Sequence, residues 1–308
     1  PYAHARVRHI HTAPAEKING VKAIHKMTPN DKIVRYVGEP IVAIAAVDAK
    51  TAQLAIDALE VQFDVLPAVI GMEQALQPSA PVIWGNNTKS APISAEGLSL
   101  PGSWDRNVRK ARINFGGLNP GKASTVIDET KSGSGHVIEA EFINGMQVHT
   151  AFEPHAAVAH WLDDDKLDVY LSTQSVTAMQ REICKHYRLK PENVHVYARH
   201  IGGGFGAKNA FAPEYVAAIE LARIAKAPVS VIPNRPEEMA NGGMRPGGKT
   251  EFKMATDRQN ELLALYSHCY NDSGVGISHL QATAIGTGYS GGARDLQDYD
   301  VVNNGAPP

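Results

Sequence analysis

A glycine-rich run, GGGFGAK at residues 202–208, has the residue types that best suit ligand chemistry. Glycines permit positive φ angles and close approach, so successive backbone N–H groups can point at an oxo group or a pyrophosphate. Taken alone, such a run is more often a tight strand-to-helix turn. It is not a Walker loop, because Lys208 is not followed by Ser or Thr, and it lacks the glycine spacing of a dinucleotide fold.

Two further polar features lie upstream of this run. The segment QVHTAFEPH contains His149, Glu153 and His155, which could ligate a metal or carry out acid–base chemistry. Pro154 breaks any helix that would align them, so we expect a strand in which they serve mainly as packing or hydrogen-bonding partners. Gln174, at the end of a predicted strand, could donate its amide to a ligand or be an ordinary surface residue.

The N-terminal part of the chain predicts a strand–helix–strand unit. Residues 40–47 form an apolar run typical of a buried strand, and residues 49–59 have apolar positions at helical spacing. Asp48 is a suitable N-cap for this helix, and residues 61–65 alternate between apolar and polar side chains, as a half-buried strand does.

Residues 77–135 are rich in Pro, Gly, Ser, Asn and Lys, and they include the turn signal Asn119-Pro120-Gly121. We expect an interdomain linker without firm secondary structure. An α+β domain is predicted beyond it. Its strands are expected at residues 137–142, 156–161, 167–173, 194–197, 229–232 and 250–255, and its helices at residues 175–187 and 214–225.

Charge and composition exclude several classes of partner. The formal net charge is −2, with 30 basic and 32 acidic residues spread along the chain, so the sequence predicts no nucleic-acid partner and no anionic membrane partner. The most apolar stretch, residues 215–232, is interrupted by Glu220, Arg223 and Lys226 before it could span a bilayer. With only 2 cysteines, the sequence predicts no disulfide framework and leaves the compartment undecided.

Several segments, in order along the chain, resemble the molybdopterin-binding large subunit of molybdenum hydroxylases, the xanthine dehydrogenase and aldehyde oxidase family. PYAHAR, GVKAI, VRYVGEPIVA and LPAV look like its α/β hammerhead domain, and HTAFEPH, STQ and IGGGFGAK look like its first molybdopterin-binding domain. The Glu153-Pro154-His155 form is most similar to bacterial aldehyde oxidoreductase large subunits. The resemblance implies an α+β fold with the hammerhead at residues 1–76, a linker at 77–135 and the molybdopterin-binding domain at 136–308, with both domains incomplete.

The resemblance also implies a cofactor site. Gln174 would stand near the apical oxo ligand of molybdenum, and the glycine run would lie along the pterin with Phe205 near the metal. Purine-hydroxylating members carry a Glu four residues beyond the loop Phe, where this chain has Asn209, which we expect to contact the substrate. The implied cofactor-binding and substrate-binding residues are Gln174, Gly202, Gly203, Gly204, Phe205, Gly206 and Asn209.

The function implied is that of an aldehyde oxidoreductase (dehydrogenase), which hydroxylates aldehydes to carboxylic acids with water as the oxygen source. Two alternatives remain: an N-heterocycle hydroxylase of the purine or isoquinoline type, and a non-catalytic molybdopterin-binding or assembly module. The general base of the family is a Glu in a second molybdopterin-binding domain beyond this C-terminus, so no catalytic residue and no protein metal ligand are expected here.

The implied cofactor is molybdenum–molybdopterin, in its plain or its cytosine dinucleotide form. The implied partners are the C-terminal half of the large subunit, an iron–sulfur subunit with 2Fe–2S clusters, and an electron-accepting subunit with FAD or haem, together a heterotrimer. The bacterial periplasm is slightly favoured over the cytoplasm.

Overall fold

Helices are interspersed with single strands and runs of strands in the computed structural model, which describes residues 1–94, 101–111, 119–277, 288–289 and 291–308. The chain divides into two units, each built from separate stretches of sequence. Unit 1 comprises Pro1–Pro67, Val148–Gly243 and Pro307, and unit 2 comprises Ala68–Gln147, Met244–Ala306 and Pro308. The fold is therefore mixed, with both helices and strands, as the sequence predicts.

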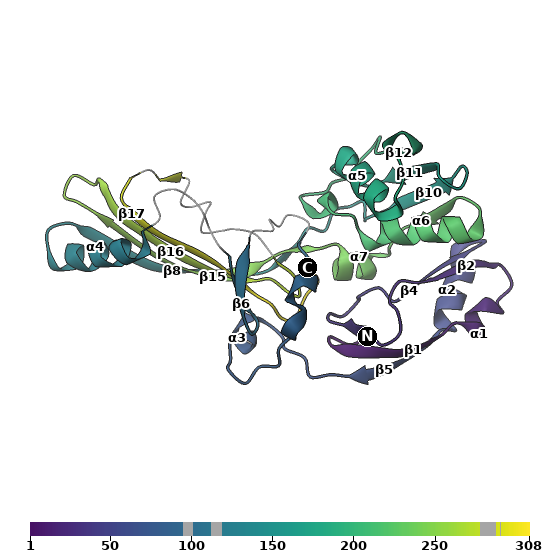
Figure 1. Cartoon of the computed structure of the whole chain (residues 1–308), viewed down its shortest axis with the longest axis horizontal. Helices are drawn as coiled ribbons and strands as arrows, with labels where there is room; N and C mark the ends of the chain where they lie inside the picture. Colours follow the sequence, from purple (N-terminus) through teal and green to yellow (C-terminus); the bar gives the residue numbers. More distant parts are fainter. Residues whose placement is uncertain (95–100, 112–118, 278–287, 290) are drawn as a thin grey trace. The chain divides into compact units, whose positions relative to one another are not determined.

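Unit 1 contains short strands and most of the helices, as Figure 1 shows. Its strands are β1 (Ala5–His11), β2 (Val21–Lys26), β3 (Ile33–Val34), β4 (Val42–Ala46), β5 (Glu60–Val65), β10 (Ala157–Trp161), β11 (Leu167–Leu171), β12 (Val194–Tyr197) and β13 (Val229–Val231). Its helices are α1 (Ala13–Glu16), α2 (Ala49–Asp57), α5 (Val176–Tyr187), η2 (Pro191–Asn193), η3 (Ala207–Asn209), α6 (Pro213–Ala225) and α7 (Arg235–Asn241).

The main core of unit 1 lies between a sheet and helices α5 and α6. The sheet has the order β12-β11-β10-β13, and β11 and β12 run parallel. Alternate residues of a strand face one side, so Leu167, Val169 and Leu171 of β11 all point into the core. Since parallel strands end at the same edge of a sheet, the segments that follow β11 and β12 begin side by side.

The N-terminal strands of unit 1 form two smaller sheets. β1 pairs with β3 and β5 around buried Ala5, Val7 and Ile10, and β2 pairs with β4. The expected strand–helix–strand elements are all present as β4, α2 and β5, although β4 and β5 belong to different sheets. The Asp48 carboxylate accepts a hydrogen bond from Thr51 N at 2.7 Å, which confirms the predicted N-cap of α2.

Unit 2 is organised around a six-stranded sheet of order β6-β7-β17-β16-β15-β8. Its strands are β6 (Gly102–Asp105), β7 (Val108–Ala111), β8 (His136–Asn144), β15 (Gly247–Thr256), β16 (Leu262–Asp272) and β17 (Ala293–Val301), and its helices are α3 (Met72–Ala75), η1 (Gly85–Ser90) and α4 (Pro120–Ser132). Helix α4 lies along β8, β15, β16 and β17 (Figure 1). The short strands β9 (Gln147–Val148) and β14 (Met244–Arg245) lie where the chain passes between the units.

The expectation that residues 77–135 lack firm secondary structure is wrong for the part that the structure describes. Asn119-Pro120-Gly121 is not a turn but the start of α4: the Asn119 side chain caps Lys122 N at 3.3 Å, and Pro120 occupies the first helical position, where its missing N–H costs nothing. Ala123 and Ile127 then bury their side chains against the sheet. Residues 95–100 and 112–118 of the expected linker lie outside the described residues.

Within the described ranges, no helix combines the length and apolar character that a membrane crossing requires.

Stability of unit 1 should depend on the side chains between α6 and its sheet. Leu221 of α6 is 1% exposed within this core, whereas Leu162, in the turn after β10, is 52% exposed. Leu221→Ala should lower the free energy of unfolding by about 2–5 kcal/mol, because it removes buried methyl groups and leaves a cavity. The matched Leu162→Ala variant should change it by less than about 0.5 kcal/mol. Urea unfolding followed by circular dichroism measures both, and equal losses would contradict this account of the core.

Candidate functional site

The glycine run forms a loop between β12 and α6, ending in the short helix η3. Gly203 and Gly206 have φ angles of 99° and 102°, a region that side-chain-bearing residues rarely adopt. Phe205 also has a positive φ, of 53°, and its side chain is 61% exposed. The loop therefore needs glycine at two positions for its backbone conformation alone.

Glu153 holds both ends of this loop. Its carboxylate accepts a hydrogen bond from Gly202 N, and its own N–H donates to Gly202 O at 3.3 Å. At the other end, Lys208 Nζ donates to Glu153 O at 2.6 Å and lies 3.8 Å from Glu153 Oε2. The Lys208 side chain is fully buried, and burial lowers the pKa of its ammonium against the raising effect of the Glu153 charge.

Gln174 holds the middle of the loop. Its Oε1 accepts from Gly206 N at 2.9 Å and from Lys208 N at 3.3 Å, and its backbone N–H donates to Lys208 O at 3.0 Å. Because both partners of the side-chain oxygen are donors, the Nε2 group is the end of the amide that remains for a ligand. Gln174 is exposed, and a Cβ at Gly204 would stand 2.6 Å from Gln174 Cγ, so these two residues are closely packed.

His155 supports the loop from its buried side. Its Nδ1 lies 3.0 Å from Glu238 Oε1, its Nε2 lies 3.2 Å from Ala207 O, and its backbone N–H donates to Glu238 Oε2 at 2.8 Å. Burial disfavours the charged ring, but the hydrogen bond and charge of Glu238 outweigh it and raise the pKa of His155. Burial likewise opposes ionisation of Glu238, yet its hydrogen bonds with His155 lower its pKa.

The predicted site residues come together in unit 1, and the structure adds residues that the sequence did not reveal. Gln174, Phe205, Asn209 and the glycines belong to one loop system, in which Asn209 Nδ2 donates to Gly206 O at 3.2 Å. Sequence reasoning missed Glu238, on α7, because the acidic first half of a short helix carries no signal for a partner 83 residues away.

The expectation of a strand around residues 149–155 is wrong, because these residues form a loop in which Thr150 has a φ of 48°. The expected hydrogen-bonding role is present for Glu153 and His155. In the described part of the chain, no three His, Cys, Asp or Glu side chains are arranged to hold a metal ion.

The arrangement presents hydrogen-bond donors to an anionic ligand. Among the described residues, the N–H groups of Gly203 and Gly204 have no acceptor, and the Gln174 amide donor is also available. The acidic groups nearby, Glu153 and Glu238, are engaged by Gly202 N and by His155. Such a site suits a group that carries oxo or phosphate oxygens, bound by neutral donors rather than by a protein metal ligand.

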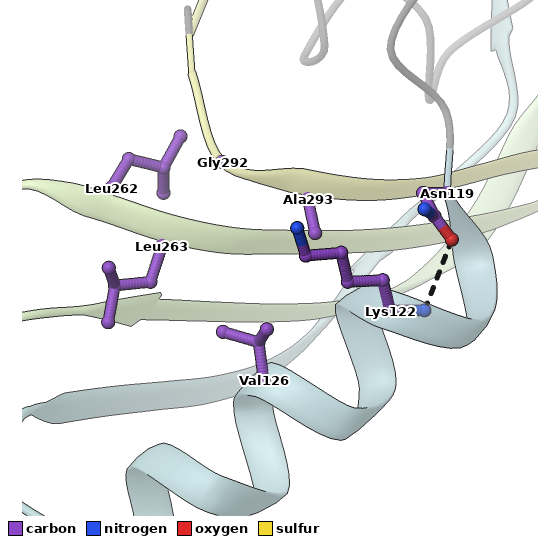
Figure 2. Close-up of a pocket in the computed structure, with 7 residues that line it drawn as sticks. All are labelled: Asn119, Lys122, Val126, Leu262, Leu263, Gly292 and Ala293. Carbon is purple, nitrogen blue, oxygen red and sulfur yellow. Dashed lines mark hydrogen bonds between the residues drawn. The ribbon is translucent and has the colours of Figure 1, made fainter.

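A pocket in unit 2 contains none of these residues (Figure 2). Its volume is about 600 Å³, and it lies between the start of α4 and strands β16 and β17. The lining residues are Asn119, Lys122, Val126, Leu262, Leu263, Gly292 and Ala293. This lining is mostly apolar, and its one charged side chain, Lys122, is exposed, so we assign no chemistry to it.

Comparison with known proteins finds a matching family model and several relatives of this chain. A family model described as a molybdopterin cofactor-binding domain matches residues 110–301, more than half of the chain. Nicotinate hydroxylase hnxS of Emericella nidulans is 24% identical over 89% of this chain and 20% of its own length. The aldehyde oxidoreductase molybdenum-binding subunit PaoC of Escherichia coli is 32% identical over 42% of this chain and 17% of its own length.

A solved structure has the same fold. Quinoline 2-oxidoreductase from Pseudomonas putida 86 superposes on 100% of this chain and 40% of its own, with a TM-score of 0.78 and 21% identity. The chain thus spans less than half the length of each of these relatives.

Crowding between Gly204 and Gln174 gives a test of the loop. Gly204→Ala should push the Gln174 side chain away from Gly206 N and Lys208 N, because the new Cβ would overlap Gln174 Cγ while the backbone φ of Gly204 remains an ordinary one. Losing two hydrogen bonds worth about 1 kcal/mol each should speed amide hydrogen exchange at these two positions by roughly tenfold or more. Bound molybdopterin in the assembled protein should fall in parallel.

Gly145→Ala is the matched control, because a Cβ at Gly145 would meet nothing within 4 Å. Unchanged exchange in the Gly204→Ala variant would show that Gln174 does not hold the loop.

Proposed function

Because the chain belongs to the molybdopterin cofactor-binding domain family, we propose that it is part of the large subunit of an oxidoreductase that hydroxylates aldehydes to carboxylic acids, with water as the oxygen source. Membership of this family confirms the resemblance seen in the sequence. We propose the aldehyde activity for the whole protein and not for this chain alone. The chain corresponds to less than half the length of each relative compared.

The loop in unit 1 fits the cofactor by its chemistry. The N–H groups of Gly203 and Gly204 and the amide of Gln174 would hold it, and the exposed Phe205 ring would pack beside it. When bound, the cofactor supplies the metal centre for two-electron oxidation and oxygen transfer. The chain's own contribution is to bind and orient, since Glu153, the acid nearest the loop, already accepts from Gly202 N and anchors Lys208.

The neutral side chain of Asn209 is the observation that supports an aldehyde substrate. It stands four residues beyond Phe205, where purine-hydroxylating members of the family have a Glu. Asn209 is exposed, and its Nδ2 is turned back to Gly206 O. It therefore offers no charge to a polar heterocycle, and a lost charge-assisted hydrogen bond commonly costs about 1.5–3 kcal/mol.

Hydroxylation of an N-heterocycle is the second candidate. The relatives named nicotinate hydroxylase and quinoline 2-oxidoreductase favour it, whereas the relative named aldehyde oxidoreductase favours the first. A non-catalytic molybdopterin-binding module is the third possibility, and measurement of turnover by the assembled complex separates it from both enzymes.

The domain assignment, the partner subunits, the form of the cofactor and the compartment are also proposals, and they rest on the same family membership. We assign residues 1–76 to a hammerhead domain and residues 136–308 to the first molybdopterin-binding domain. The partners proposed are the rest of the large subunit, which provides the general base, an iron–sulfur subunit, and a flavin or haem subunit. The cofactor is proposed in its plain or its cytosine dinucleotide form, and for the compartment the bacterial periplasm stays slightly favoured over the cytoplasm.

Substrate preference provides the test. The assembled enzyme should have a kcat/KM for an aromatic aldehyde at least about tenfold above that for hypoxanthine, which corresponds to the missing charge-assisted hydrogen bond. Asn209→Glu should shift this ratio toward hypoxanthine by about tenfold, and Asn209→Gln, which stays neutral, should leave it in place. Comparable constants for the two substrates in the unmodified enzyme, or a preference for nicotinate, would count against the aldehyde assignment.

A further inference from the structure

We propose that His155 and Glu238 are positioning residues for the cofactor loop, and that a doubly protonated His155 ring holds the Ala207 carbonyl so that cofactor retention depends on this buried proton. The inference rests on the proposed cofactor-binding role of the loop, and it does not depend on the identity of the substrate.

The hydrogen-bond partners of the ring determine its protonation state. Nδ1 faces the Glu238 carboxylate at 3.0 Å, and Nε2 faces Ala207 O at 3.2 Å. A carboxylate and a backbone carbonyl are both acceptors, so both ring nitrogens must carry a proton for both bonds to exist. A neutral ring would leave one buried acceptor without its donor.

Ala207 connects this ring to the ligand-facing side of the loop. Its neighbours Gly206 and Lys208 donate the two N–H groups that Gln174 Oε1 accepts, and Ala207 N donates to Gly204 O at 2.9 Å. The loop is thus held by Gln174 on its exposed side and by His155 on its buried side. Release of the Ala207 carbonyl would free the segment that aligns the Gln174 amide.

The surroundings of the ring are charged on several sides. His155 is 3% exposed and Glu238 is 7% exposed. The titratable groups that face the pair are Glu238 from α7, Glu214 and Tyr215 from α6, Lys208 from η3, and Glu153 from the same loop as His155. Burial raises the pKa of Glu214. Glu238 is the main counter-charge of the ring, because it contacts Nδ1 directly at 3.0 Å and acts on the pKa of His155 more strongly than Glu214 does.

The pH dependence has a definite sign. The pKa of His155 is raised above its ordinary 6.5. The stabilisation of the loop by the charged ring is therefore complete below pH 6.5 and disappears as pH rises through the raised pKa. The pKa of Glu238 is lowered below its ordinary 4.5, so its contribution disappears only as pH falls through that lowered value. The loop should hold the cofactor best between these two limits.

The experiment uses the assembled enzyme from a host that supplies molybdopterin. Cofactor release and amide hydrogen exchange, corrected for the intrinsic effect of pH, are measured across residues 201–212 from pH 5 to pH 10. The unmodified enzyme should show release and exchange that rise at least threefold across one transition above pH 6.5. His155→Gln, which keeps an amide donor group but cannot be charged, should start at the faster rate and show no such transition.

Glu238→Gln provides a second arm, because removing the counter-charge should move the transition to lower pH by about one unit or more. The control is His195→Gln: the exposed His195 forms a similar pair with Asp168 at 2.9 Å, and this variant should behave like the unmodified enzyme. A transition that stays in place in both the His155 and the Glu238 variants, or no transition in the unmodified enzyme, would overturn the proposal.

Two outcomes separate this inference from the proposed function. An enzyme that binds molybdopterin with the expected transition but prefers heterocycles would contradict the aldehyde assignment and support the positioning role of His155 and Glu238. An enzyme that binds no molybdopterin would overturn the cofactor role and the retention claim together.

Discussion

The buried ammonium of Lys208 is the constraint on which the rest of the site depends. A charged group that is fully removed from water must be paired and hydrogen-bonded, because its desolvation otherwise costs several kcal/mol. Lys208 meets this requirement through the carbonyl and the carboxylate of Glu153. This pairing fixes the loop that contains Glu153, and Glu153 in turn holds Gly202 at the start of the glycine run.

The sheet of unit 1 supplies the rigid support that this arrangement needs. Parallel strands β11 and β12 end at one edge, where Gln174 follows the first and the glycine loop follows the second. Helix α6 then continues from the loop and buries Tyr215, Ile219 and Leu221 in the core beneath it. Ligands of open α/β sheets commonly bind at such a carboxyl edge, which agrees with the cofactor-binding role of the family.

The loop combines neutral hydrogen-bond donors with charged groups that are already paired. The amide of Gln174 and the free N–H groups of Gly203 and Gly204 suit an anionic ligand, while the Glu153 and Glu238 carboxylates are already engaged. Under the proposed function, the protein would thereby orient a group that brings its own reactive chemistry. Under the same proposal, differences in substrate would come from exposed side chains such as Asn209.

By itself the sequence determined the family, the position of the glycine loop after a strand, and the position of Gln174 at a strand end. It also determined most strands and helices of residues 156–232, because each of these features has a local signal in residue type or periodicity. Helix α4 was missed, although its local signal was present, since Asn119 and Pro120 suit a turn and a helix start equally well. Only the tertiary structure decided that buried Ala123 and Ile127 make it a helix against the sheet of unit 2. The pair of His155 with Glu238 was likewise a tertiary outcome, because a bond across 83 residues depends on how α7 packs and leaves no trace in either local sequence.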